Sequence, residues 1–223
     1  MLPLSDQHTD NPHTTALISS FHVLFDTAHM WNDVPGLSSV LAVHVERDLA
    51  EGVFEIAFAR YPLVAMAQQW LVGRGATPDR FTDRTPVTAA DQETTRVERL
   101  LREAEPDRYA IHDHYTYADV PYDTWVIATD THNDTSARPV RVFHEQHQVD
   151  ADTYTLREGH FTSIETARTW AEDPSAPLPQ VAPSPSAQAA AARQQTQGGT
   201  GTGTVVGATP AAPPPVTDRT RAR

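Results

Sequence analysis

The stretch from residue 36 to residue 71 reads GLSSVLAVHVERDLAEGVFEIAFARYPLVAMAQQWL, and the predicted fold depends on it. Apolar and polar residues alternate in two segments of this stretch, which is the period of a half-buried strand. Residues 48–52 lie between the segments and end in glycine, which suits a turn. The apolar residues of the two segments are Leu41, Val43 and Val45, then Phe54, Ile56 and Phe58. The pattern therefore predicts a β-hairpin.

A helix is predicted directly after the hairpin. Pro62 suits the first turn of a helix, where its missing N–H is not needed. Residues 63–71 follow at helical spacing, and Gly73 and Gly75 end the helix. An alternative interpretation makes residues 49–60 helical, because some of their apolar side chains also fit a period of 3.6. The strict alternation and the aromatic and β-branched content favour the strand.

The rest of the chain predicts more helices and a run of strands. Residues 14–31 and 88–105 show helical periodicity, the second with a narrow apolar stripe among charged residues that can form ion pairs. A last helix is predicted from about residue 162 to 172, where TSIE resembles a capping box. Strand-like segments joined by short turns span residues 108–117, 124–131, 138–147 and 153–161. The predicted class is therefore α+β, with antiparallel β-sheet packed by three to four helices.

Residues 58–71 are weakly similar in sequence to residues 158–171. Aligned without gaps, the matched pairs are Tyr61 with Phe161, Val64 with Ile164, Ala67 with Ala167, and Trp70 with Trp170. One interpretation is a duplication, with two related β-hairpin–helix halves at 14–76 and 106–173 joined by the charged helix 88–105. The other is chance, because such spacing is common in helices that pack on sheets.

The two ends of the chain differ from its middle in composition. Residues 1–13 are polar and are predicted to be disordered. Residues 174–223 are rich in Pro, Ala, Gly and Thr and contain few large apolar side chains, so they are predicted to form a disordered C-terminal tail. The folded α+β domain is accordingly expected at residues 14–173.

Composition restricts the chemistry and the compartment. The chain has no Cys, which excludes disulfides and thiolate sites. Its seventeen basic residues are all Arg, as expected from a GC-rich genome. The N-terminal residues do not resemble a signal peptide, and no apolar run approaches the length of a membrane span. A cytoplasmic protein without membrane contact is expected.

The charge of the chain is uneven. Residues 1–173 hold 13 arginines against 28 carboxylates, a net charge of −15. An acidic domain repels phosphate backbones, so direct nucleic-acid binding is not expected. The acidity suits either a basic protein partner or solubility alone.

Two groups of residues have the composition of metal sites. In the predicted strand His112 and His114 share a face, and Asp130 with His132, or Glu145 with His147, could supply a third ligand from an adjacent strand. At helical spacing, one arc collects His22, Asp26 and His29 of the predicted helix 14–31 and Asp33, which lies just beyond its end. The alternative is that both are ordinary solvent-facing polar surfaces.

No catalytic motif of high specificity is present. The chain lacks a glycine-rich phosphate loop, a Gly-x-Ser-x-Gly elbow and a His-Glu-x-x-His pair. No cofactor is predicted. The leading hypothesis is a non-enzymatic acidic interaction or accessory protein that binds a protein partner. The alternatives are an acidic DNA mimic that inhibits a nucleic-acid-binding protein, and a metal-dependent enzyme with a site at His112 and His114.

Overall fold

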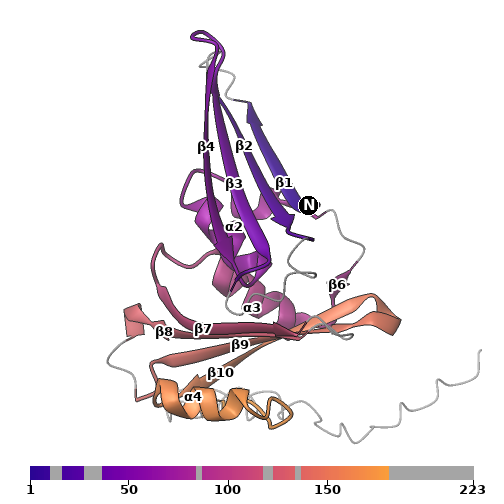
Figure 1. Cartoon of the computed structure of the whole chain (residues 1–223), viewed down its shortest axis with the longest axis vertical. Coiled ribbons are helices and arrows are strands. Elements are labelled where there is room, and N and C mark those ends of the chain that lie inside the picture. Colours follow the sequence, from indigo (N-terminus) through magenta and orange to yellow (C-terminus); the bar gives the residue numbers. More distant parts are fainter. Residues whose placement is uncertain (11–16, 28–36, 84–86, 118–122, 134–136, 181–223) are drawn as a thin grey trace, which may run out of the picture. The chain divides into compact units, whose positions relative to one another are not determined.

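The structure is a computed structural model, and it describes residues 1–10, 17–27, 37–83, 87–117, 123–133 and 137–180. The described residues form two sheets and three helices, connected by turns and loops (Figure 1). The first sheet has the order β4-β3-β2-β1-β5, and the second has the order β6-β10-β9-β8-β7. All strand pairs are antiparallel except β10 with β6. This arrangement confirms the predicted α+β class.

The elements of the first sheet are β1 (Leu2–Asp10), β2 (Leu17–Phe25), β3 (Val40–Asp48), β4 (Val53–Tyr61) and β5 (Thr82–Asp83). Those of the second sheet are β6 (Thr88–Ala89), β7 (Tyr109–Tyr117), β8 (Asp123–Asp130), β9 (Val140–Gln148) and β10 (Thr153–Phe161). The helices are α2 (Val64–Val72), α3 (Gln92–Arg102) and α4 (Ile164–Ala171). Short 3-10 turns lie at Pro78–Arg80, Thr131–Asn133 and Val149–Ala151.

The two sheets contain the same unit of four strands and a helix. The hairpin β3–β4 and helix α2 recur 100 residues later as β9–β10 and α4. The register recurs too, since Val40 pairs with Tyr61 and Val140 with Phe161. The first strand of each unit carries a bulge at the same place, one residue before Ser5 opposite Val23 and one residue before Asp113 opposite Ile127. The described structure is therefore a repeat of a ββββα unit.

Each helix of the repeat folds back over the same face of its own sheet. The cluster under α2 is Phe21, Val23, Val40, Ala42, Ala67, Leu71 and Ala76. The cluster under α4 is Ile127, Val140, Val142, Phe161, Ala167, Trp170 and Ala171. Trp70 packs against the first cluster as Trp170 packs within the second. The sequence similarity between residues 58–71 and 158–171 thus corresponds to equivalent positions in two packed units.

The second sheet is also covered on its other face. Helix α3 begins at Asp91, whose side chain accepts a hydrogen bond of 2.8 Å from the Thr94 backbone N–H. Its apolar stripe, Val97 and Leu101, is buried as the sequence predicted. The shared cluster joins α2 and α3 to this face through Leu63, Ala65, Met66, Val97, Leu101, Val126, Phe143 and Leu156. The second sheet is thus covered on both faces.

The prediction for the N-terminal region is wrong. Residues expected to be disordered form β1, and the expected helix 14–31 contains β2 instead; residues 11–16 and 28–36 lie outside the described part. The inner side of β1 is largely polar. Buried Ser5 and Gln7 accept hydrogen bonds from Gln68 Nε2 at 3.1 Å and from the Thr77 N–H at 3.0 Å, and Leu4 packs on the cluster under α2. A strand with hydrogen-bonded polar residues on its core side shows no hydrophobic period, and pairing with β3 overrides the helical spacing of β2.

The other boundaries shift by smaller amounts. The predicted helix 88–105 divides into β6 and α3, and α4 begins after Ser163, where Thr166 completes the capping box. The predicted tail begins too early. The Ala176 carbonyl accepts from Trp170 Nε1 at 2.8 Å, and the Pro179 carbonyl accepts from the His160 N–H at 2.8 Å. Residues 174–180 thus belong to the packed unit, and residues 181–223 of the predicted tail lie outside the described part.

Candidate functional site

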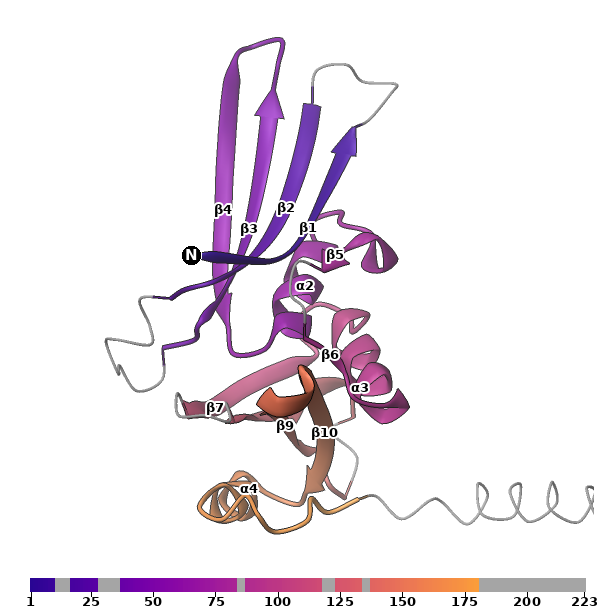
Figure 2. The ribbon, with the colours of Figure 1, turned by 90° about the vertical axis from the view of Figure 1, so that its right-hand side faces the viewer.

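An exposed apolar surface lies on the β3–β4 hairpin. Phe54, Ile56 and Phe58 are 70%, 53% and 69% exposed. They alternate with Tyr61 and the other residues on the side that faces α2, so they project from the opposite side of the sheet. Figure 2 shows the strands of the first sheet running past α2. These three side chains have the pattern of a buried strand face but are open to solvent.

The neighbouring strand continues this surface. In the register of the hairpin, Val43 lies opposite Phe58 and Val45 opposite Ile56, and both valines are only partly buried. We call the five residues Val43, Val45, Phe54, Ile56 and Phe58 the apolar face. None of the described helices packs against it. On the other side of the hairpin end, Glu46 lies opposite Glu55, and both are exposed. The hairpin end is therefore amphipathic, with its apolar side uncovered by described residues.

Histidines adjoin the apolar face on β2 and β1. His22 lies opposite Val43, and its ring meets that of His8 edge to face at 5.5 Å between centroids. Burial lowers the pKa of His22, the charges of His8 and Arg47 lower it further, and Asp6 acts in the opposite direction. The lowered pKa of His22 favours its neutral form at pH 7. An uncharged imidazole beside the valines extends the weakly polar surface across the sheet.

The predicted pair His112 and His114 does not share a face. The β7–β8 register shifts between Ile111 and Asp113, which makes His112 the bulged residue. His112 Nε2 lies 2.7 Å from Thr129 Oγ1, whereas His114 Nε2 lies 3.2 Å from Ser38 Oγ. The bulge reverses the alternation on which the shared face depended.

The residues predicted as third ligands have other partners. Asp130 binds Arg108 and Arg141, His132 lies 3.0 Å from Glu105, and Glu145 lies 3.3 Å from His147. Within the described ranges no group of three His, Asp or Glu side chains is arranged to hold a metal ion.

The structure does not support the second candidate metal site, which was expected on one face of a helix. His22 lies on a strand rather than a helix, and Asp26 accepts a bond of 2.7 Å from Arg60 Nη2. His29 and Asp33 lie outside the described residues.

A buried charge network lies in the second sheet. Asp130, fully buried, accepts from Arg108 at 3.0 and 3.1 Å and from Arg141 at 3.2 Å. Burial raises the pKa of Asp130. The bonds and charge of Arg108, the charge of Arg141 and the bond from the His132 backbone together outweigh it, so the pKa lies below its usual value. Arg141 also pairs with Glu158 at 3.2 Å. Burial raises the pKa of nearby Tyr109 to about 12. The carboxylates are neutralised by arginines, so the network suits a structural role.

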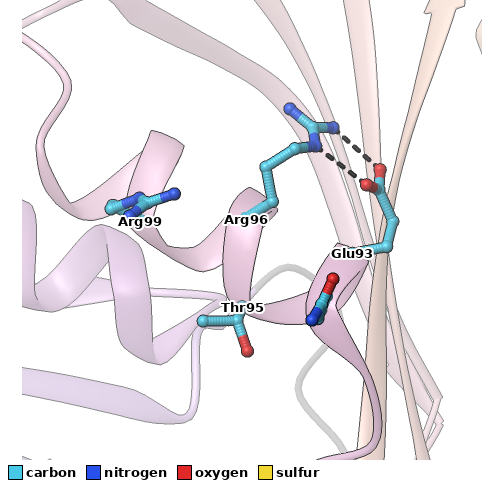
Figure 3. Close-up of a pocket in the computed structure, with 5 residues that line it drawn as sticks. Glu93, Thr95, Arg96 and Arg99 are labelled. Carbon is cyan, nitrogen blue, oxygen red and sulfur yellow. Dashed lines mark hydrogen bonds and ion pairs between the residues drawn. The ribbon is translucent and has the colours of Figure 1, made fainter. Parts of the chain in front are cut away.

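A shallow hollow lies on the surface of α3, and one of its two arginines is paired with a carboxylate. It has a volume of about 440 Å³ and is lined by Gln92, Glu93, Thr95, Arg96 and Arg99 (Figure 3). Arg96 donates two hydrogen bonds to Glu93, at 2.9 and 2.8 Å. This is the i,i+3 ion pair that the sequence predicted.

The exposure of the apolar face is not explained by any contact with the described hydrophobic clusters. None of the described helices has the length and apolarity needed to cross a membrane. Comparisons with protein-family models, with curated proteins and with solved structures find no match to this chain.

Proposed function

We propose that this protein is a non-enzymatic interaction or accessory protein that binds a protein partner on the apolar face. The observation that carries the proposal is the exposure of Phe54, Ile56 and Phe58 side by side on one strand. Contiguous exposed apolar side chains are typical of interaction sites. Full burial of each such side chain contributes about 1.5–3 kcal/mol. Covering the exposed portions would supply a useful share of the free energy of binding.

The charges around the hairpin end favour a partner with a basic rim. Glu46, Glu51 and Glu55 are exposed there. Arg47, in the same part of the sheet, donates a bond of 2.7 Å to Ser20 Oγ. Glu46 and Glu55 lie on the opposite side of the sheet from the apolar face, and Glu51 lies in the turn at its end. Basic residues of a partner that extends around the end of the hairpin would meet these carboxylates, which speeds association and selects the orientation.

The arrangement of carboxylates supports this proposal over a DNA mimic. A DNA mimic needs a row of unpaired carboxylates spaced like phosphates. Here many of them lie beside an arginine, and the pairs are Asp26 with Arg60, Asp91 with Arg157, Glu93 with Arg96, and Asp113 with Arg168. Alternating charge signs weaken the negative field that would attract a nucleic-acid-binding surface.

A matched pair of variants tests the proposal. Phe58→Ser removes an apolar side chain from the apolar face, and Val149→Ser does so at a 53% exposed position in the turn between β9 and β10. Each full-length chain is used to capture proteins from a lysate of its own host, after circular dichroism shows that it is folded. We expect one protein to be retained by the wild type and by Val149→Ser and to be lost with Phe58→Ser. Equal retention by all three chains would contradict the proposal.

A further inference from the structure

The outer edge of β10 is occupied by its own chain. The Ala90 N–H donates to the Tyr154 carbonyl at 2.9 Å, and the Leu156 N–H donates to Thr94 Oγ1 at 3.2 Å. The His160 N–H donates to the Pro179 carbonyl at 2.8 Å. The carbonyl of Glu158, between the last two, accepts from Gln180 Nε2 at 2.9 Å. The alternate residues Tyr154, Leu156, Glu158 and His160 of this edge therefore all have partners, which come from the residues around β6, from α3 and from residues 174–180. The edge of the second sheet is protected against further pairing.

Among the described residues, no strand pairs with the equivalent edge of β4. β4 is the terminal strand of its sheet, and the residues 100 positions before Tyr154, Leu156 and His160 are Phe54, Ile56 and Arg60. No described backbone or side-chain group bonds the outward N–H groups of Phe54 and Ile56. A nine-residue apolar edge strand that is neither covered nor interrupted by Pro or Lys is a template for pairing with another strand.

The sequence of β4 is complementary to itself. Residues 54–58 read FEIAF, which is symmetric about Ile56 in its large apolar residues. If two β4 strands pair antiparallel about a two-fold axis at Ile56, Phe54 of each copy lies opposite Phe58 of the other. Glu55 then lies opposite Ala57. A shift of the axis to Glu55 would instead place two carboxylates opposite each other, which is unfavourable.

We propose that a second copy of this chain occupies the β4 edge, through antiparallel β4–β4 pairing centred on Ile56. The inference rests on the proposed function in assigning the apolar face to binding, and it names the first occupant. The pairing joins two first sheets into one continuous sheet. The two apolar faces become neighbours on one side of it, and this doubled surface is then available to the protein partner.

The expected affinity is modest. A buried aromatic side chain removes about 150–250 Å² from water. Edge-to-edge pairing covers the flanks of Phe54, Ile56 and Phe58 and leaves their outward surface open, so the buried area is well below a standard interface of about 1,200–2,000 Å². Backbone bonds add to this contact. We therefore expect a dimer that dissociates in the micromolar range.

The absence of cysteine allows a direct test of the register. Ile56→Cys introduces the chain's only thiol at the two-fold axis. Paired residues there have Cα atoms about 5.5 Å apart, within the range for a disulfide. Phe54→Cys is the matched control, because it lies on the same strand with similar exposure but places the two thiols about 13 Å apart in this register. Mild oxidation followed by non-reducing electrophoresis measures the cross-linking.

The result expected is rapid cross-linking of Ile56→Cys and at least ten-fold slower cross-linking of Phe54→Cys. Sedimentation of the wild type between 1 and 200 μM is expected to show a rise from 24.5 kDa towards twice that mass. Ile56→Lys, which places two like charges at the axis, is expected to stay monomeric. A wild type that is monomeric throughout, a dimer that Ile56→Lys leaves intact, or equal cross-linking of both thiols would overturn the inference. If the wild type is monomeric but still captures another protein through Phe58, the β4–β4 pairing is wrong and the proposed function still holds.

Discussion

Gly52 and Asp152 occupy the same position in two hairpins 100 residues apart, and both have a left-handed backbone, with φ of +66° and +49°. Each residue directly precedes the second strand of its hairpin. Glycine adopts this conformation without steric cost, and aspartate tolerates it better than most other residues. The recurrence of one unusual backbone conformation supports the interpretation of the chain as a repeated unit.

This turn predicts the effect of a methyl group at position 52. We expect Gly52→Ala to lower the free energy of unfolding by about 1–2 kcal/mol, because Cβ disfavours the left-handed conformation. The space itself is open, since no atom lies within 4 Å of the added carbon. Gly73→Ala is the control, because its φ of −59° is an ordinary helical value. Urea unfolding compares the two, and equal losses would contradict the backbone explanation.

The buried network predicts a large loss when Asp130 is removed. Asp130→Ala leaves Arg141, which is 5% exposed, without one of its carboxylates, and Arg108 also loses its partner. Removing one member of a buried ion pair costs roughly 3–5 kcal/mol. Asp113→Ala breaks an exposed pair with Arg168 and should cost less than about 1 kcal/mol. Chemical unfolding measures both, and similar losses would show that the network is not important for stability.

The central hairpin and helix were predictable because their signals are local. The alternation around Val43 and Ile56 requires no distant contact, and glycines mark the end of the helix. The side of the sheet that the helix covers was not predictable. β3 has apolar residues on both sides, and α2 packs on the side of Val40 and Ala42. The more apolar side, with Phe54 and Phe58, is the one left open.

Other features depended on long-range pairing that a single sequence does not reveal. β1 places Ser5 and Gln7 inward, where hydrogen bonds replace apolar contacts. A one-residue bulge at His112 reverses the faces of the residues that follow it, and no sequence signal marks it. The predicted metal ligands were separated by that bulge.

Residues 174–180 are predicted to stabilise the second unit. Leu178 packs on the cluster under α4, and the Pro179 carbonyl binds the edge of β10. A chain that ends at residue 173 should therefore be less stable than one that ends at residue 180, by about 2–4 kcal/mol for the lost apolar contact and hydrogen bonds. Thermal unfolding of the two truncated chains measures the difference. Equal stability would restore the original boundary at residue 173.

Gly159→Ala gives an independent check of the same segment. A Cβ at position 159 would lie 2.5 Å from Leu178 Cδ2 and 3.2 Å from its Cβ, so the segment would have to shift. We expect the substitution to destabilise the chain that ends at residue 180 more than the chain that ends at residue 173.

The cap of α3 predicts a dependence of stability on acid pH. Hydrogen bonds from Arg157, then from the Thr94 backbone, lower the pKa of Asp91 from 3.8 to about 2. Because the folded pKa lies below the unfolded value, this carboxylate stabilises the fold above pH 4, and the contribution is lost as the pH falls from about 4 to about 2. Asp91→Asn keeps a capping side chain but has no titrating charge. Unfolding midpoints between pH 2 and 6 should fall less steeply for Asp91→Asn than for the wild type, and parallel curves would contradict the assignment.

The bulge in β7 predicts that no metal ion depends on both His112 and His114. Their imidazoles bond to Thr129 and to Ser38, on opposite sides of the sheet, so one ion cannot reach both without a change of register. We expect elemental analysis of protein from its own host, and zinc titration followed by calorimetry, to give the same metal content and affinity for the wild type, His112→Ala and His114→Ala. His8→Ala, which removes an exposed histidine from the first sheet, controls for weak surface binding. Loss of about one equivalent of metal in both His112→Ala and His114→Ala, but not in His8→Ala, would instead establish the metal site and favour an enzyme.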